Sequence, residues 1–150
     1  MNLDTLKQWM AGAGLDGKED ADGFLLVARR NLEISVAYLE EVDLVVCFAP
    51  LLELAGLDGA QRLEALSQSL ALNGVGALPP CCALSYDEVA DVVYLLWRQS
   101  PEQLDSAAFE NAFDDFVTAA AQVQEYLRGL LAESDGAESG RDAQDFLLKV

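Results

Sequence analysis

Residues 23–49 contain three apolar segments separated by short links, and this spacing constrains the fold more than any other feature of the sequence. In the middle segment, Leu32–Leu39, apolar side chains alternate with other residues, which is the period-2 pattern of a β-strand. Asn31 marks a turn before this strand, and residues 40–43 turn the chain after it. A parallel crossover needs a dozen residues or more, so the three strands must pair antiparallel.

Apolar periodicity in the rest of the chain predicts three helices and two further strands. The predicted helices span residues 2–13, 60–72 and 100–132, and the predicted strands span 23–29, 32–39, 44–49, 81–86 and 89–98. Pro50 is expected to end the third strand. Ser100 and the residues after it match a helix N-cap followed by an N1 proline and a capping-box glutamine. The order (α-β-β-β-α-β-β-α) indicates an α+β fold with a twisted, five-stranded antiparallel sheet and three helices.

The length of 150 residues favours a single domain. We expect the folded part to cover residues 1–132. Residues 133–150 begin with an acidic, glycine-bearing segment that cannot bury enough apolar surface to order itself, so we expect a flexible C-terminal tail.

The net charge of −17, from 26 acidic against 9 basic residues, restricts the kinds of partner. Such a field repels nucleic-acid phosphates and anionic membrane surfaces. No apolar run approaches the roughly 20 residues that would span a bilayer, and the N-terminus has no signal pattern. We therefore expect a cytoplasmic protein that binds no nucleic acid and inserts into no membrane.

The residue types needed for common catalytic chemistry are largely missing. The chain has no histidine, which excludes Ser-His-Asp and Cys-His catalysis and the commonest zinc ligand. The vicinal pair Cys81-Cys82 could be a redox pair or half a metal site, but buried small side chains are the favoured interpretation. Carboxylate pairs such as Asp114-Asp115 are better explained as solvated surface. We expect no cofactor, no metal and no enzymatic activity, and a small histidine-independent enzyme with an apolar pocket is the alternative.

The predicted sheet has more apolar surface than three helices can easily cover. The first, third and fifth strands are apolar on both faces, whereas a sheet packed on one side alternates apolar with polar residues. A second subunit, a peptide partner or both would cover the surplus. The alternative is that the long helix covers one face and the other helices cover the opposite face.

Alternation along the strands divides the apolar residues between the two faces. We assign Leu25, Val27, Val45 and Cys47 to the face that binds a partner, with Arg29 at its rim. The bulkier set is expected to pack under the long helix and consists of Phe24, Leu26, Ile34, Val36, Tyr38, Val46 and Phe48. A β-bulge would invert this assignment.

The element order, size and acidity resemble the class I type III secretion chaperones, the Tir-chaperone-like family. The stretches that carry the resemblance are residues 22–26, 43–46, 84–87, 92–95 and 104–131. The resemblance implies a bacterial cytosolic chaperone that binds a non-globular segment of a secreted effector and keeps it soluble and export-competent. Binding would combine strand addition with apolar pockets. A regulatory protein on the same fold, which binds another chaperone or an anti-activator, remains an alternative.

The resemblance also implies a homodimer that is joined largely through the second helix and the neighbouring strand. Leu63, Leu66 and Leu70 form one stripe of that helix, and Cys81 begins the strand. These four residues are the expected dimer interface.

Overall fold

The computed structural model describes residues 1–74 and 76–134. Its elements are α1 (Leu3–Gly12), β1 (Lys18–Glu19), β2 (Leu25–Arg29), β3 (Leu32–Leu39), β4 (Leu44–Glu53), α2 (Gly59–Gly74), β5 (Cys82–Asp87), β6 (Val92–Gln99), the 3-10 helix η1 (Pro101–Gln103) and α3 (Ser106–Ser134). The predicted α+β class and the order of the long elements are confirmed. Residues 133 and 134 end α3, and the remainder of the predicted tail lies outside the described residues.

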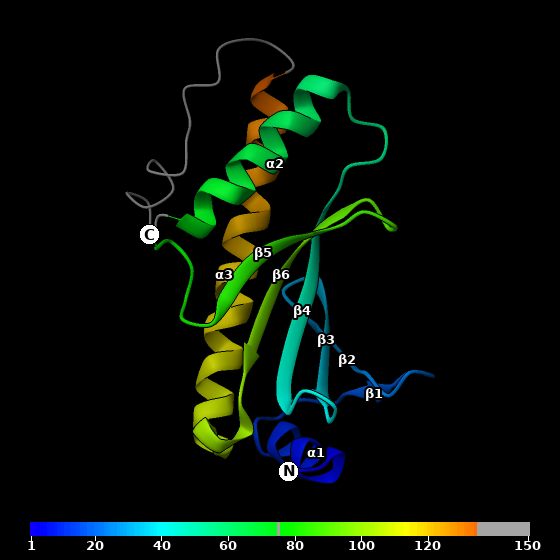
Figure 1. The fold of residues 1–150 in the computed structure, drawn as a ribbon, viewed down its shortest axis with the longest axis vertical. Helices are drawn as coiled ribbons and strands as arrows, with labels where there is room; N and C mark the ends of the chain where they lie inside the picture. The colour runs from blue at the N-terminus through cyan, green and yellow to red at the C-terminus, as the bar shows by residue number, and fades with distance from the viewer. Residues whose placement is uncertain (75, 135–150) are drawn as a thin grey trace.

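The strands form one antiparallel sheet in the order β1-β2-β3-β4-β6-β5 (Figure 1). It has six strands where the sequence predicted five, because Lys18 and Glu19 pair with Leu26 and Leu25. This two-residue strand lies in the segment predicted as a loop, and a pair so short leaves no periodic pattern to detect.

The turn between β2 and β3 shows how the local sequence sets the register. Arg29 pairs with Leu32, so Arg30 and Asn31 form a two-residue loop. Both have positive φ, +49° and +62°, which is the conformation of a type I′ hairpin turn. Asparagine tolerates this left-handed region better than most residues, so the turn expected at Asn31 is confirmed.

The third predicted strand does not end at Pro50. Its counterpart β4 continues to Glu53, and the pairing with β6 shifts between Pro50 and Leu52. Proline has no N–H to donate and is accommodated where a bulge interrupts the ladder. The extension buries Leu51.

The long helix α3 also begins later than predicted. Ser100 makes no side-chain capping bond, and the proline after it starts only the short turn η1. Asp105 caps the helix instead, because its Oδ1 accepts a hydrogen bond from the N–H of Ala108 at 2.7 Å. Aspartate at this position satisfies one of the unpaired N–H groups of the first turn.

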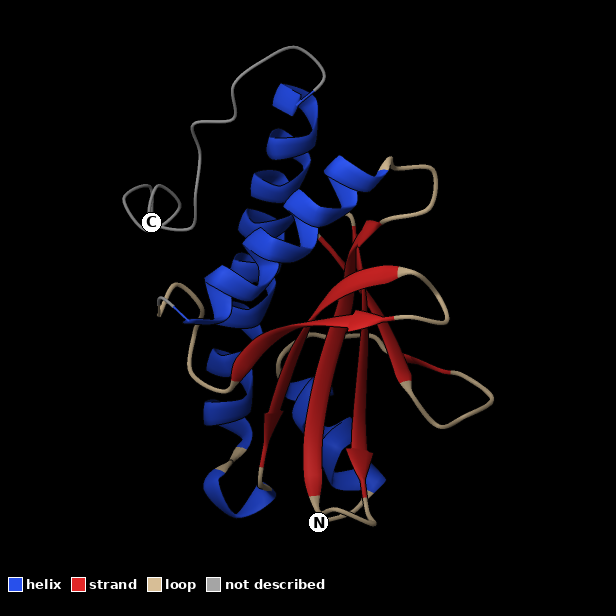
Figure 2. Cartoon of the chain, turned by 45° about the horizontal axis from the view of Figure 1, so that its top comes forward, coloured by secondary structure: helices blue, strands red, loops and turns tan. Residues whose placement is uncertain are grey.

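The helices gather on one face of the sheet, which we call the inner face (Figure 2). The core is centred on Phe109 of α3, whose ring lies 6.0 Å from that of Trp9, 6.4 Å from that of Trp97 and 6.1 Å from that of Phe113. Phe109 is fully buried. Helix α2 packs on α3 and beside β5, so one face of the sheet carries the hydrophobic core.

Candidate partner-binding groove

The four apolar residues predicted to bind a partner lie in the core. Leu25, Val27, Val45 and Cys47 are 2%, 4%, 0% and 0% exposed, and all belong to the main hydrophobic cluster with the buried residues of α1 and α3. The predicted face assignment is therefore wrong: these side chains point under the helices. Arg29, predicted at the rim of the binding face, is exposed. Its guanidinium donates a hydrogen bond to the carbonyl oxygen of Gly14 at 3.1 Å, away from the face of the sheet that the helices leave open.

Strand register explains the error. Leu25 pairs with Val36, Val36 with Cys47, and Cys47 with Trp97, so these residues share the inner face. The sequence assignment groups Ile34 and Val36 with Phe24, on the face opposite to Leu25 and Cys47. Alternation sorts residues within one strand, but the pairing between strands decides which sets lie together.

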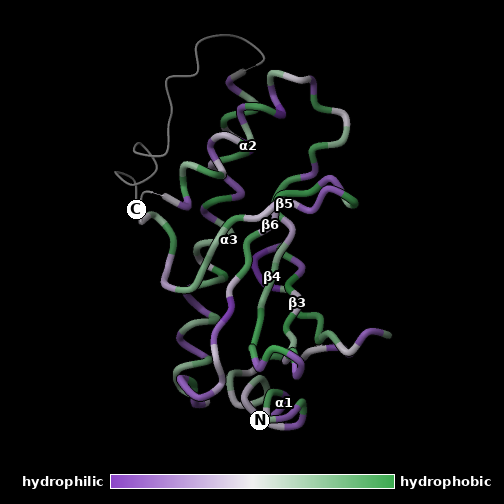
Figure 3. Tube along the Cα trace, in the orientation of Figure 1, coloured by the Kyte–Doolittle hydropathy of each residue, from purple (hydrophilic) through white to green (hydrophobic). Residues whose placement is uncertain are grey.

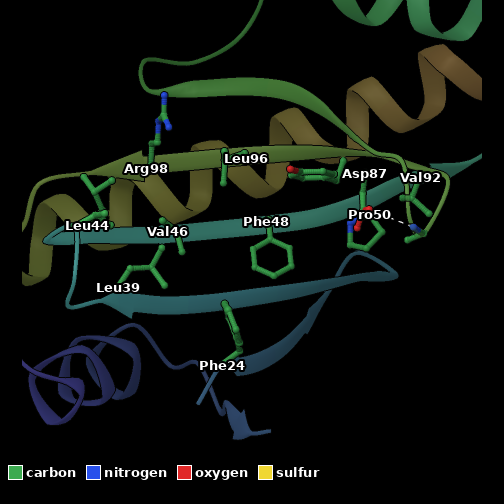
Figure 4. A pocket seen from close by; sticks show the side chains of 13 residues that line it. Phe24, Leu39, Leu44, Val46, Phe48, Pro50, Asp87, Val92, Leu96 and Arg98 are labelled. Carbon is green, nitrogen blue, oxygen red and sulfur yellow. Dashed lines mark hydrogen bonds between the residues drawn. The ribbon is translucent and has the colours of Figure 1, made fainter. Parts of the chain in front are cut away.

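An apolar groove of about 560 Å³ lies on the opposite face, which we call the outer face (Figure 4). Its walls come mainly from β4 and β6, two adjacent inner strands of the sheet. The residues that line it are Phe24, Leu39, Val42, Leu44, Val46, Phe48, Pro50, Asp87, Ala90, Val92, Tyr94, Leu96 and Arg98. The hydrophobic colour along β4 in Figure 3 follows from this arrangement, because β4 is apolar on both faces.

Aromatic rings cross the middle of the groove. The ring of Phe48 lies 5.6 Å from that of Phe24 and 6.3 Å from that of Tyr94, and both contacts are edge-on. Edge-to-face contacts are the favourable arrangement for such rings. Val46 is only 6% exposed and forms part of the floor. Leu39 and Val42 at one end are 37% and 59% exposed, so the groove carries apolar surface that no described element of the chain covers.

The dimer interface predicted on α2 has the exposure that such a role requires. Leu63 and Leu70 are 68% and 71% exposed, because the other side of α2 packs inward through Ala65, Ser69 and Leu72. Leu66 is half-buried against the core, and Cys81 is exposed. Dimerisation through these residues stays a prediction.

A polar network fixes α2 against the β5–β6 turn. Arg62 donates to both carboxylate oxygens of Asp91 at 2.9 Å, and Tyr86 donates to Asp91 at 2.6 Å. The hydrogen bonds from Arg62 and then from Tyr86 lower the pKa of Asp91 to about 2. Arg62 also donates to the carbonyl oxygen of Leu54, so this arginine ties the helix to two loops and orients its exposed leucines.

A second side chain of α2 covers part of the sheet edge. Asn73 accepts from the N–H of Leu84 at 2.7 Å and donates to its carbonyl oxygen at 3.0 Å. The amide thereby replaces the bonds that a further strand would make at this position of β5.

The three cysteines are free thiols. Cys47 is buried, and burial raises the pKa of its thiol. Cys82 is half-buried, which raises its pKa to about 12. The expectation that both vicinal cysteines are buried is wrong for Cys81, whose thiol is exposed. Among the described residues, no group of three or more histidine, cysteine, aspartate or glutamate side chains is placed to hold a metal ion.

The fold and the groove define a class of protein: an α+β domain that offers apolar binding surface on the open face of its sheet. Residues 4–124 match the model of the Tir chaperone protein (CesT) family. The match covers most of the chain, and the chain belongs to this family of type III secretion chaperones.

Solved structures with the same fold include such chaperones. One is the HopA1–SchA chaperone–effector complex, with a TM-score of 0.60, 11% identity, and 81% of this chain and 91% of that chain covered. The ExoT–SpcS complex from Pseudomonas aeruginosa matches with a TM-score of 0.57 and 21% identity over 81% of this chain and 98% of that chain.

The fold also occurs in proteins described in other ways. YbjN from E. coli, described as a putative transcription regulator, matches with a TM-score of 0.65 and 14% identity over 86% of this chain and 93% of that chain. No match to a curated protein sequence was found. Within the part of the chain that the structure describes, no helix combines the length and apolarity needed to cross a bilayer.

Proposed function

We propose that the chain is a type III secretion chaperone that binds a non-globular segment of a secreted effector in the groove on the outer face of its sheet. The observation that carries this proposal is the position of the groove. It is lined by apolar and aromatic side chains from β4 and β6, on the face opposite the helices. A groove of this kind, in a chain of this family, suits an apolar segment of a partner.

Binding in the groove needs no chemistry. Three apolar side chains of the partner, buried between Phe48 and Tyr94 and the ends of the groove, would contribute roughly 5–9 kcal/mol before the cost of ordering the segment. The effector segment would thereby be held away from water and from other chains. The net charge of −17 keeps the protein soluble while apolar surface is exposed during binding and release of the partner.

We further propose that the chaperone is a homodimer in the bacterial cytosol. Leu63 and Leu70 project from α2 with Cys81 at the neighbouring strand, and a second copy would bury them. A dimer of this kind leaves the groove open, because the groove lies over β4 and β6. Each dimer would then present two grooves to one effector.

The experiment that tests the groove uses a pair of Asp substitutions. Leu39 is 37% exposed and lines the groove, whereas Ala107 is exposed in the first turn of α3 and lies outside the groove lining. The effector is identified by co-purification from cells that express the secretion system, and its bound segment is then titrated calorimetrically.

We expect Leu39→Asp to weaken binding at least tenfold, because it places an unpaired charge against the bound apolar segment. Ala107→Asp, the control, should bind as the unchanged protein does. Equal affinity of both variants and the unchanged protein would contradict binding in this groove. Circular dichroism of both variants checks that the fold is retained.

A further inference from the structure

The two charged side chains that line the groove lie at its opposite ends. Arg98 is the one cation among the thirteen lining residues, and Asp87 is the one anion. Figure 4 shows Arg98 at the end formed by Leu39 and Leu44, and Asp87 at the other end beside Val92. The groove is therefore apolar along its length, with a positive charge at one end and a negative charge at the other.

Both charges are available to a partner. Arg98 is exposed, and its guanidinium takes part in neither of the ion pairs found among residues 1–74 and 76–134. Oδ1 of Asp87 accepts from the N–H groups of Val89 and Ala90 at 2.9 and 3.1 Å, and these bonds leave its second oxygen unused. Glu88, also exposed, follows Asp87 directly and strengthens the negative end.

The position of the groove selects the conformation of its occupant. The floor is the face of β4 and β6, whose backbone groups already pair with each other and with β3 and β5. An extended segment laid on this face could not join a ladder, and its own N–H and C=O groups would lie unpaired against apolar side chains. A helix satisfies those groups internally and presents one apolar stripe to the groove.

We propose that Arg98 and Asp87 fix the direction in which a helical partner segment lies in the groove, with its N-terminus and a basic side chain at Asp87 and its C-terminus and an acidic side chain at Arg98. The helix dipole adds to both side-chain pairs in this direction, because it is positive at the N-terminus and negative at the C-terminus. This assignment rests on the proposed function, since it concerns the same groove.

The distance between the two charges sets the length of the segment. Asp87 pairs with Val92, which lies six positions before Arg98 on β6. At about 3.3 Å per strand residue, the charges are about 20 Å apart. A helix rises about 1.5 Å per residue, so its basic and acidic residues should be about 13 positions apart.

The first test observes the direction itself. The probe is a 16-residue acetylated and amidated amphipathic helix of leucine, alanine and glutamine, with lysine at position 2, glutamate at position 15 and a spin label at its N-terminus. The paramagnetic broadening of protein amide signals is mapped by NMR. In the unchanged protein, we expect broadening at Val92 and not at Leu44. In the charge-swapped variant with Arg98→Asp and Asp87→Arg, the broadening should move to Leu44.

Affinities give the second test. Arg98→Glu should lower the affinity for the probe about two- to fivefold, which is the range for a partly exposed ion pair. In 1 M NaCl this difference in affinity should disappear. For a probe with glutamine in place of glutamate, Arg98→Glu should cause a smaller loss of affinity. Lys18→Glu, on the exposed edge strand β1 and outside the groove lining, changes the net charge equally and should leave both affinities unchanged.

The outcomes separate the two proposals. Binding of the probe in both directions, or in one direction that the charge swap does not reverse, would contradict the role of Arg98 and Asp87 and leave the groove intact as a binding site. If neither probe binds the unchanged protein at millimolar concentration, the groove is not a site for apolar helices and the inference fails. The proposed function is then decided separately, by the titration of the Leu39→Asp variant with the effector's own segment.

Discussion

Neighbouring leucines on β6 offer a sharp test of which face is core and which is open. Leu95 is 0% exposed on the inner face, whereas Leu96 is partly exposed and lines the groove. Leu95→Ala removes three buried carbons, worth roughly 2.4 kcal/mol in transfer, and leaves a sealed cavity, so the expected loss is about 3–4 kcal/mol. Leu96→Ala widens a groove that is already open to water, so its cost should be about 1 kcal/mol.

The assay is urea unfolding followed by tryptophan fluorescence, at one protein concentration for the unchanged chain and both variants. The free energy of unfolding should fall about three to four times as much for Leu95→Ala as for Leu96→Ala, with similar m-values. Only Leu96→Ala, the groove variant, should lower the affinity for the effector segment without a large loss of stability. Equal destabilisation by the two substitutions would refute the assignment of the inner and outer faces.

Three further predictions concern α2 and the thiols. Leu70→Asp should convert the dimer to a 16.2 kDa monomer in sedimentation equilibrium, and a chain that is already monomeric at micromolar concentration would contradict the proposed interface. Since the pKa of Asp91 is lowered to about 2, the stabilisation by ionised Asp91 is full above about pH 4 and is lost as pH falls through about 2. The difference in urea midpoint between the unchanged chain and Arg62→Met should therefore be constant from pH 5 to 7 and shrink below pH 4, and a difference independent of pH would count against the network. In the Leu70→Asp monomer, Cys81 should react with a thiol reagent within minutes and Cys47 only after unfolding, as mass spectrometry of the labelled peptides can show; equal rates would contradict the difference in exposure between the two thiols.

Local patterns were sufficient to predict most of the elements. The bounds of β3, Leu32–Leu39, agree with the sequence prediction because a turn with positive φ at Asn31 and an alternating run both leave local signals. The later start of α3 was missed because Ser100 has the residue type of an N-cap but not its hydrogen bond. The choice between Ser100 and Asp105 depends on where the chain leaves β6, which is a tertiary property.

The binding face was the part that sequence reasoning placed wrongly, although it predicted correctly that apolar surface would be left over. The assignment assumed that the bulkier set packs under the long helix. In the structure, Phe24, Val46 and Phe48 of that set instead line the open groove, and smaller residues such as Val45 and Cys47 pack under α3. Side-chain size is a poor guide here, because aromatic residues also serve as anchors on binding surfaces. Arg98, in phase with Leu96 on β6, was the signal that could have marked the outer face.

The most direct test of the groove is a methyl NMR experiment on the complex with the effector segment. Isotope-edited spectra should give intermolecular contacts to the methyl groups of Val46 and Leu96, which face the groove, and none to those of Val45 and Leu95, which face the core. Contacts confined to α2 or to the edge strand β5, with Val46 and Leu96 unchanged, would contradict the account.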